Sequence, residues 1–246
     1  MPSPAERALA SVTRLGLRLP DGVELTPTAG AALEVIVEAL ADDRQAPSTV
    51  RDPDSSWRVH IADSLSGLCF EQLAKAERIA DVGSGAGFPG LPLAAVLPDA
   101  QVDLIEATGR KCEFIESVIA DAELARARVV CERAESAAAA EGREAYDAVT
   151  ARAIGRLSTI AELASPLLTV GGALVAWKGR RDGAEEAELE RGAPGLAMTL
   201  VEVRSVGPYP GSRNRHLHLL QKTGPTPDGL PRRPGLAKKR PPGRAT

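Results

Sequence analysis

The sequence of 246 residues predicts an α/β fold, in which a parallel, helix-covered sheet ends in an antiparallel hairpin and follows a helical extension. Strand-like and helix-like patterns alternate from residue 77 onward, which is typical of a parallel sheet. The last two strand-like runs are joined by a turn-rich segment without a helix, so we expect them to pair antiparallel. The first 45 residues carry helical patterns alone.

The N-terminal region predicts two helices, a loop and a third, short helix. Apolar residues recur at helical spacing over Pro4–Leu19, and Thr26-Pro27 supplies an N-cap and a first-turn proline for a helix over Ala31–Ala41. Residues 45–57 are polar and contain prolines, so we expect a loop there, followed by a short helix around Ile61–Glu71.

The main domain predicts five parallel strands and a terminal pair. The expected parallel strands are Arg78–Val82, Gln101–Glu106, Val129–Cys131, Asp147–Thr150 and Ala173–Trp177. The expected helices between them are Gly90–Val96, Arg110–Asp121, Leu157–Leu163 and Ala184–Arg191. The terminal pair is Thr199–Val206 and Arg215–Gln221. This ending differs from the six-stranded dinucleotide-binding fold, in which the parallel order continues to the last strand.

Composition and charge predict one globular domain with appendages. We divide the chain into a helical extension (1–45), a main domain (46–223) and a basic, proline-rich tail (224–246). The net charge of -3 conceals an asymmetry, because residues 204–246 carry ten Lys or Arg residues against one acid. Residues 1–203 carry twenty against thirty-two. A basic tail on an acidic body predicts contact with a polyanion, and the final twenty residues should be mobile unless a partner orders them.

We expect a cytoplasmic protein without a metal site. A membrane-spanning helix needs about 18 consecutive apolar residues, and no apolar run in the sequence approaches that length. The first residues also lack the apolar core of a secretory signal. Cys69, Cys112 and Cys131 are too scattered for a disulfide framework, so we expect free thiols in a reducing compartment. His216 and His218 have no Cys or carboxylate at ligand spacing, so we expect no bound metal.

The most informative motif is the loop at residues 79–90, IADVGSGAGFPG. Its alternating glycines Gly83, Gly85 and Gly87 let backbone amides approach a ligand that a Cβ would exclude. The pattern read from Gly83 wraps the methionyl part of S-adenosylmethionine, whereas the pattern read from Gly85 is the pyrophosphate fingerprint of NAD and FAD. Asp81 favours the first ligand, because a carboxylate there attracts an ammonium group and repels a pyrophosphate. Glu106 can accept both ribose hydroxyls of either ligand, and an ordinary strand-to-helix turn is the third alternative.

The sequence also restricts the methyl acceptor. The fourth strand ends without the Asn/Asp-Pro-Pro-aromatic segment that holds an exocyclic amine, and no cysteine lies in the Pro-Cys loop needed for attack through a pyrimidine carbon. A ring nitrogen with an available lone pair, such as guanine N7, needs only alignment with the donor and exclusion of water. Arg152, which follows the fourth strand, is a candidate positioning cation for the donor carboxylate or for guanine O6.

Several motifs together resemble one family, the RsmG (GidB) 16S ribosomal RNA guanine-N7 methyltransferases. The matching stretches are Thr49–Pro53, His60–Leu65, Asp81–Leu93, Arg133–Glu135, Asp147–Ala153, Gly171–Gly179 and Pro231–Lys239. The Phe-Pro-Gly-Leu-Pro ending of the glycine loop and the Pro-Arg-Arg-Pro-Gly tail are the most specific of them. The chain departs from the family's Trp-Asn…Asn-Leu-Thr segment, of which residues 42–49 keep only the threonine.

The resemblance implies a Rossmann-like class I methyltransferase sheet, S-adenosylmethionine as methyl donor and small-subunit ribosomal RNA as substrate. It places donor-binding positions at Gly83, Phe88, Ala134, Glu135 and Arg152, with Arg152 also the candidate catalytic residue. The chemistry of the residues adds four donor contacts, at Asp81, Gly85, Gly87 and Glu106. The expected RNA contacts in the tail are Arg232, Arg233, Lys238, Lys239 and Arg240.

Two alternatives remain at this stage. The first is an S-adenosylmethionine-dependent methyltransferase of a small molecule or protein, which would not need the basic tail. The second is a non-catalytic or dinucleotide-dependent protein. We expect a monomer with no membrane partner.

Overall fold

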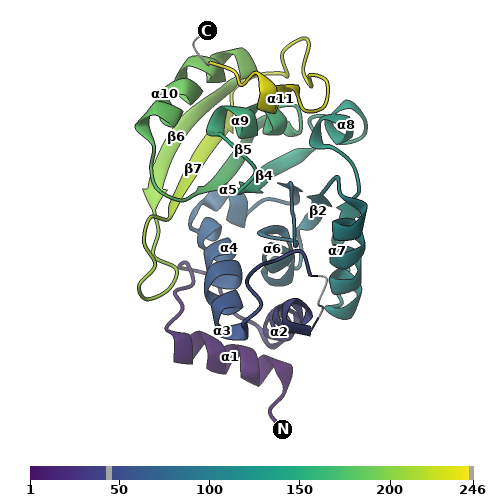
Figure 1. Ribbon diagram of the computed structural model, residues 1–246, viewed down its shortest axis with the longest axis vertical. Coiled ribbons are helices and arrows are strands. Elements are labelled where there is room, and N and C mark those ends of the chain that lie inside the picture. The colour runs from purple at the N-terminus through teal and green to yellow at the C-terminus, as the bar shows by residue number, and fades with distance from the viewer. Residues whose placement is uncertain (43–45, 244–246) are drawn as a thin grey trace.

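The computed structural model describes residues 1–42 and 46–243 and contains a seven-stranded sheet in the order β3-β2-β1-β4-β5-β7-β6 (Figure 1). The strands are β1 Arg78–Val82, β2 Gln101–Ile105, β3 Ala127–Val130, β4 Tyr146–Arg152, β5 Leu168–Lys178, β6 Met198–Ser205 and β7 His216–Lys222. Strands β1 to β5 pair in parallel, and β7 runs antiparallel to both β5 and β6. The predicted α/β class and its terminal antiparallel pair are therefore confirmed.

Helices cover both faces of the sheet because β1 to β5 and β7 alternate their apolar side chains between two cores. In β4, Ala148 belongs to one core and its neighbour Val149 to the other. The first core includes residues of α2, α6 and α7, and the second includes residues of α8, α9 and α10. The bounds are α2 Pro27–Asp42, α6 Gly90–Val96, α7 Gly109–Asp121, α8 Ala134–Ala139, α9 Leu157–Ala164 and α10 Gly183–Gly192, followed by the 3-10 turn η3 Ala193–Leu196.

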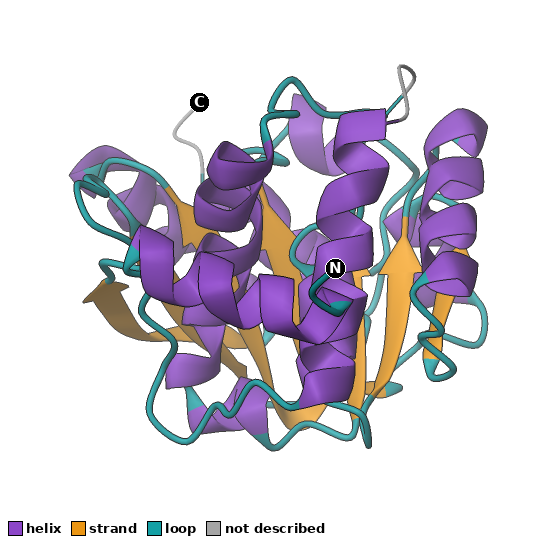
Figure 2. Cartoon of the chain, turned by 90° about the horizontal axis from the view of Figure 1, so that it is seen from below, coloured by secondary structure: helices purple, strands orange, loops and turns teal. Residues whose placement is uncertain are grey.

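The helical extension packs onto the sheet. Helix α1 (Pro4–Leu15) begins at a capping box formed by Ser3 and Glu6, and it ends before Gly16, which has a φ of 60°. Helix α2 starts at the predicted cap, where Thr26 Oγ1 accepts a hydrogen bond from Ala29 N. Ala8 and Leu33 share the first core with strand residues, and from below these helices lie in front of the strands (Figure 2).

The expected loop over residues 45–57 is wrong in its second half. Asp52 caps a helical segment by accepting from Ser55 N at 2.9 Å, and the turns continue to Ala74. The segment is α3 Pro53–Ser56, the π-helix η1 Trp57–Ala62, α4 Asp63–Leu65, the 3-10 helix η2 Ser66–Cys69 and α5 Glu71–Ala74. The polar pattern misled because residues 52–55 are exposed or half-buried, and the helix becomes buried only from Ser56 and Trp57 onward. Helix α8 was also not expected.

The tail is anchored to the main domain rather than mobile. Its short helix α11 (Leu236–Lys239) lies beside α9 (Figure 1), where Thr159 Oγ1 donates to Ala237 O. Arg232 forms an ion pair with the buried Glu162. Polar contacts of this kind leave no apolar signal in the sequence, which is why mobility was expected. The predicted boundary at residue 45 and the last residues of the tail, 244–246, lie outside the described residues.

The expectation of three free thiols is also wrong. Cys112, in the first turn of α7, forms a disulfide with Cys131, which follows β3, and their Cα atoms are 5.9 Å apart. Cys69 is free. The crossover through α7 brings together two residues that are 19 positions apart, and no motif in the sequence marks this pairing.

Candidate functional site

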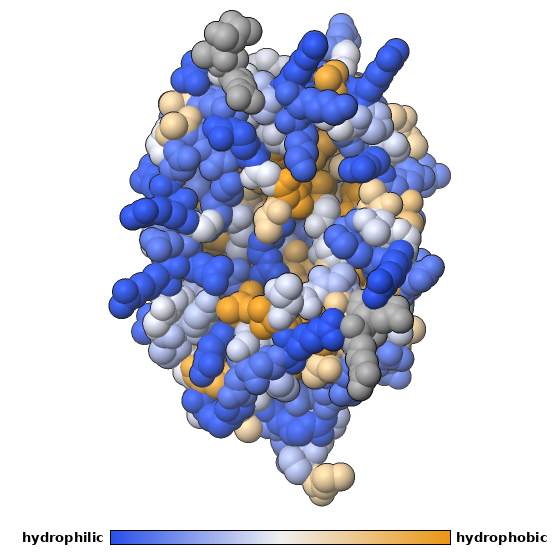
Figure 3. Space-filling model, in the orientation of Figure 1, coloured by the Kyte–Doolittle hydropathy of each residue, from blue (hydrophilic) through white to orange (hydrophobic). Residues whose placement is uncertain are grey.

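The sheet changes direction between β1 and β4, and the candidate site lies at the carboxyl ends of these strands. The chain enters the sheet at β1, proceeds outward to β2 and β3, and then returns to the other side of β1 as β4. Loops that diverge at such a point leave a crevice for a ligand. The space-filling view shows a hollow with hydrophobic residues in the middle of this face, surrounded by hydrophilic residues (Figure 3).

The glycine loop follows β1 and needs its glycines for two physical reasons. Gly83, Gly85 and Gly87 have φ values of 68°, 64° and 92°, in the left-handed region that other residues rarely adopt. A Cβ on Gly83 would lie 2.5 Å from Cγ2 of Ile154. The loop therefore keeps its backbone open on one side and packs tightly against the segment after β4 on the other.

Asp81 lies beneath this loop rather than facing the crevice. Its side chain is fully buried, where Oδ1 accepts from Thr150 Oγ1 at 2.8 Å and Oδ2 accepts from Gly90 N at 3.1 Å. Burial raises the pKa of Asp81 to about 6, although the hydrogen bonds from Thr150 and Gly90 oppose that rise. The expected contact with an ammonium group is therefore not made in this conformation, because no carboxylate oxygen reaches the surface. The residue instead ties the loop to β4 and to the start of α6.

Glu106 follows β2 and does reach the crevice. Its Oε2 accepts from Gly85 N at 3.1 Å, and its Oε1 accepts from Thr108 N at 2.9 Å. Burial raises the pKa of Glu106, but the hydrogen bonds from Thr108 and the charge of Lys111 outweigh burial and hold it below its usual value. An ionised carboxylate at this position can accept hydroxyl groups of a ligand.

Four of the nine predicted donor-binding residues line one cavity of about 210 Å³, the glycine-loop pocket. Gly83, Glu106, Ala134 and Glu135 all line it, whereas Gly85 and Gly87 lie in the loop beside it. Its other lining residues are Val82, Ile105, Ala107, Glu132, Arg133, Ile154, Thr159, Leu163, Gly235, Ala237 and Lys238. Three of these belong to the tail, and Gly235 N donates to Glu135 Oε1 at 2.7 Å. The tail therefore forms part of the pocket wall.

Phe88 and Arg152, which were also predicted to bind the donor, do not line this pocket, and both contact the π-helix η1. The ring of Phe88 stacks on His60, with centroids 4.4 Å apart, and the Arg152 guanidinium lies 5.4 Å from the centroid of Phe88. Arg152 Nη1 donates to Asp63 Oδ2 and to Val59 O, each at 3.1 Å. Phe88 and Arg152 were predicted to belong to the site. They contact His60 and Asp63, which were not.

The hydrogen bonds of His60 determine its tautomer. Arg152 Nη2 lies 3.2 Å from His60 Nδ1, and an arginine can only donate, so Nδ1 accepts. Ser48 Oγ lies 2.9 Å from His60 Nε2. Because the Ser48 hydroxyl donates its hydrogen bond to Val50 O, its oxygen accepts from Nε2. The proton of His60 is therefore on Nε2. Burial, followed by the charge of Arg152, lowers the pKa of His60 to about 4, so the ring is neutral at pH 7.

A second cavity of about 180 Å³ adjoins Arg152 on the side away from the glycine loop, and we call it the Arg152 pocket. It is lined by Asp63, Arg152, Ala153, Trp177, Lys178, Gly179, Val206, Arg215, His216 and Leu217. Arg152 and Ala153 line this pocket and the next residue, Ile154, lines the glycine-loop pocket, so consecutive residues of the chain border the two cavities. A π-helix often marks such a site, but the sequence gives no signal for one.

The predicted RNA contacts of the tail divide into two groups. Arg232 is engaged inside the protein by Glu162, whose side chain is 3% exposed. Arg233, Lys238, Lys239 and Arg240 are exposed, and none of them forms an ion pair within residues 1–42 and 46–243. The exposed group borders the glycine-loop pocket through Lys238.

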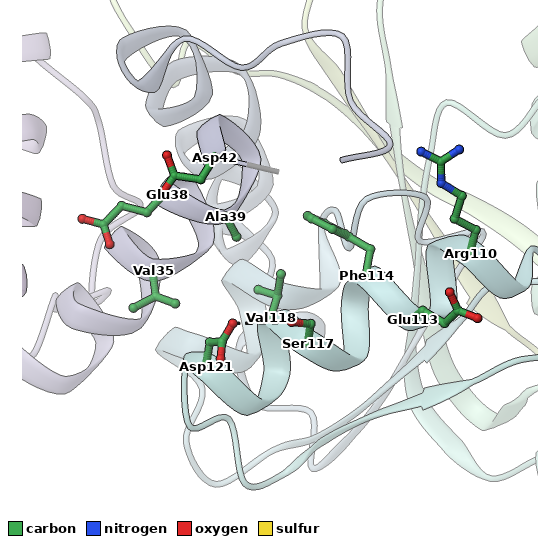
Figure 4. Close-up of a pocket in the computed structure, with 10 residues that line it drawn as sticks. All are labelled: Val35, Glu38, Ala39, Asp42, Arg110, Glu113, Phe114, Ser117, Val118 and Asp121. Atoms are coloured by element: carbon green, nitrogen blue, oxygen red, sulfur yellow. Dashed lines mark hydrogen bonds between the residues drawn. The ribbon is translucent and has the colours of Figure 1, made fainter. Parts of the chain in front are cut away.

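Another groove, of about 470 Å³, lies between α2 and α7 (Figure 4). Phe114 and Val118 project from α7 toward α2, while Glu38, Glu113 and Asp121 are among its acidic lining residues. An acidic groove repels phosphate groups, so a nucleic acid would approach the molecule elsewhere.

Residues 1–42 and 46–243 contain neither a membrane-spanning helix nor a metal cluster. Every helix there is too short or too polar to cross a lipid bilayer. No group of three or more His, Cys, Asp or Glu side chains is arranged to hold a metal ion in the same part of the chain.

Comparison with known proteins points to one family. The family model GidB, described as rRNA small subunit methyltransferase G, matches residues 42–217. The ribosomal RNA small subunit methyltransferase G of Rubrobacter xylanophilus is 40% identical over 228 residues, which cover 89% of this chain and 86% of that protein. The protein of the same name from Chloroflexus aggregans is 42% identical, covering 81% and 84%. A predicted O-methyltransferase of Agrobacterium tumefaciens superposes with a TM-score of 0.50 at 26% identity, covering 67% and 80%.

Proposed function

The chain belongs to the family of rRNA small subunit methyltransferase G, and from this membership we propose that it methylates N7 of a guanine in 16S ribosomal RNA, with S-adenosylmethionine as donor. The observation that carries the proposal is the glycine-loop pocket at the β1–β4 switch point, within the part of the chain that matches the family. Methyl transfer to a small molecule or protein is not favoured.

The residues of the glycine-loop pocket fit the donor. Gly83 lines the pocket and has no side chain, so the loop offers backbone at close range, and the left-handed conformations of Gly85 and Gly87 shape the following turns. Glu106 retains lone pairs for the ribose hydroxyls beside its bonds to the loop. At the start of α8, Ala134 and Glu135 border the position for the adenine edge. Asp81 acts from below by positioning the loop.

The reaction needs no general base. The donor supplies an electrophilic methyl group, so the lone pair of guanine N7 forms the new C–N bond while the electrons of the C–S bond return to sulfur. No proton moves, and the methylated base becomes positively charged. The protein therefore has to align the two substrates and exclude water. We assign this alignment to Arg152, which lines the Arg152 pocket, and to Phe88, whose ring lies against the Arg152 guanidinium.

Ribosomal RNA is held through its phosphates. The exposed Arg233, Lys238, Lys239 and Arg240 lie on the tail beside the glycine-loop pocket, where they attract a polyanion. Arg232 contributes by anchoring the tail through Glu162. We further propose that the protein acts as a monomer in the cytoplasm, without a metal ion.

Nucleoside analysis tests the function directly. 16S ribosomal RNA from a strain without the gene should lose one 7-methylguanosine, and the purified protein with S-adenosylmethionine should restore it in small subunits or their precursors. A 7-methylguanosine content that is the same with and without the gene would overturn the proposal. Full activity after removal of residues 231–246 would instead exclude the tail from substrate binding.

A further inference from the structure

The Arg152 pocket contains a buried acidic side chain whose hydrogen bonding is incomplete. The side chain of Asp63 is 2% exposed, and its Oδ2 accepts from Arg152 Nη1. Its Oδ1 has no hydrogen-bond partner among the described residues, and Arg215 Nε lies 3.7 Å from it. Arg215 Nε itself also lacks a hydrogen-bond partner in the described chain. Leaving both groups unsatisfied in a buried position costs free energy, so they need an explanation.

The position of Asp63 is fixed by its backbone. Trp177 Nε1 donates to Asp63 O at 2.7 Å, and Ser66 Oγ donates to the same oxygen at 2.6 Å. The carboxylate cannot turn away from the pocket without breaking its bond to Arg152. Its free oxygen is therefore held ready for a donor that comes from a ligand.

We propose that the Arg152 pocket receives the guanine to be methylated and that Asp63 reads its Watson–Crick edge. The inference rests on the proposed function and adds the acceptor site and its specificity-determining residue. Guanine presents two adjacent donors on this edge, N1–H and the N2 amino group, and a carboxylate has acceptor positions for both. Adenine presents an unprotonated N1 there, which the carboxylate repels. A flipped base is commonly recognised on this edge.

Arg215 completes the recognition. Guanine O6 lies between N1 and N7 around the ring, so a base held by Asp63 directs O6 toward a neighbouring cation. Arg215 is 3.7 Å from Asp63 Oδ1, and its Nε is unused. Its Nη2 is held by Tyr209 Oη at 2.8 Å. A single donor to O6 leaves the lone pair of N7 available for methylation.

The same arrangement favours the product charge. Methylation at N7 makes the purine cationic and its N1–H and N2 groups more acidic, so their hydrogen bonds to a carboxylate strengthen as the reaction proceeds. Binding that strengthens in the transition state increases the rate. Consecutive residues, Ala153 and Ile154, line the Arg152 pocket and the glycine-loop pocket, so the proposed base site and the proposed donor site border the same segment after β4.

The substitution Asp63→Asn tests the proposal. Arg152 needs an acceptor, so the amide oxygen will face Arg152 and the NH₂ group will face the guanine donors. We expect kcat/KM to fall roughly ten- to hundredfold, as for loss of a hydrogen bond to a charged group. The substrates are small subunits reconstituted with guanosine or inosine at the methylated position, since inosine lacks the N2 amino group. Wild type should prefer guanosine, and Asp63→Asn should lose most of this preference.

Two further variants keep the test decisive. Asp54→Asn makes the same change at an exposed position of α3, and it should leave kcat/KM and the guanosine preference unchanged. Arg215→Met should lower kcat/KM about tenfold while the affinity for S-adenosylmethionine, measured by calorimetry, stays within about threefold. Equal guanosine-to-inosine ratios in wild type and Asp63→Asn, or wild-type activity of Arg215→Met, would overturn the proposal. Failure of wild type to form 7-methylguanosine would instead overturn the proposed function.

Discussion

The imidazole of His60 lies parallel to the ring of Phe88, with an interplanar angle of 10° and centroids 4.4 Å apart. His60 belongs to the π-helix η1 and Phe88 to the glycine loop, so this stack links the helix to the loop. His60 also accepts from Arg152 through Nδ1. The stack therefore connects the position of the glycine loop to Arg152, which lines the Arg152 pocket.

His60 should make stability depend on pH. Its pKa is lowered from 6.5 to about 4 in the folded protein, so between these values the unfolded chain binds a proton that the folded chain rejects. Its contribution is fully present above pH 6.5 and is lost as the pH falls toward 4, by up to about 3 kcal/mol. Urea unfolding at pH 7 and pH 4.5 should show a smaller loss for His60→Gln than for wild type. Parallel losses in both proteins would contradict the burial argument.

Gly83 should tolerate no side chain. Gly83→Ala places a Cβ 2.5 Å from Ile154 and forces alanine to a φ of 68°, so the loop must move. We expect the affinity for S-adenosylmethionine to fall at least about tenfold, because a shift of the loop misplaces several contacts. Calorimetry measures this directly. Gly109→Ala is the matched control, since a Cβ there meets nothing within 4 Å, and its affinity should equal that of wild type.

Arg152→Ala should affect both activity and stability. Loss of the aligning group should lower kcat about a hundredfold or more. The substitution also leaves the buried Asp63 carboxylate without its ion-pair partner, so the free energy of unfolding should fall by about 3 to 5 kcal/mol. Arg14→Ala removes an exposed ion pair with Asp54, and it should change stability by about 1 kcal/mol or less. Single-turnover methylation and urea unfolding check both effects, and normal methylation by Arg152→Ala would refute the assigned role.

The two groups of tail cations should separate experimentally. Replacing Arg233, Lys238 and Lys239 with Ala should weaken RNA binding and reduce the slope of log K against log salt by about 0.7 to 0.9 for each phosphate that the variant no longer neutralises. Their exposure means that stability should not change. Arg232→Ala should instead release the tail from Glu162 and lower the affinity for S-adenosylmethionine. An unchanged salt slope in the triple variant would remove these side chains from the interface.

The alternation of strands and helices, the terminal antiparallel pair and the glycine loop could be predicted because each depends on local sequence, whereas the order of the strands in the sheet was not predicted. Apolar periodicity located β1 at Arg78–Val82 and α6 at Gly90–Val96 with the bounds that the structure has. The loop was recognisable because glycines at alternate positions are what allows its backbone to approach a ligand closely. Family membership also followed from contiguous motifs.

Only the tertiary structure decided what the polar side chains do. Asp81 lies near the end of β1 and Glu106 directly follows β2, yet Asp81 is buried beneath the loop and Glu106 borders the pocket. Asp63 meets Arg152 across 89 positions of sequence. The disulfide and the anchored tail likewise depend on residues brought together by crossovers. Burial and partner choice are set by the packing of elements distant in the chain, and a local pattern of residues contains no record of that packing.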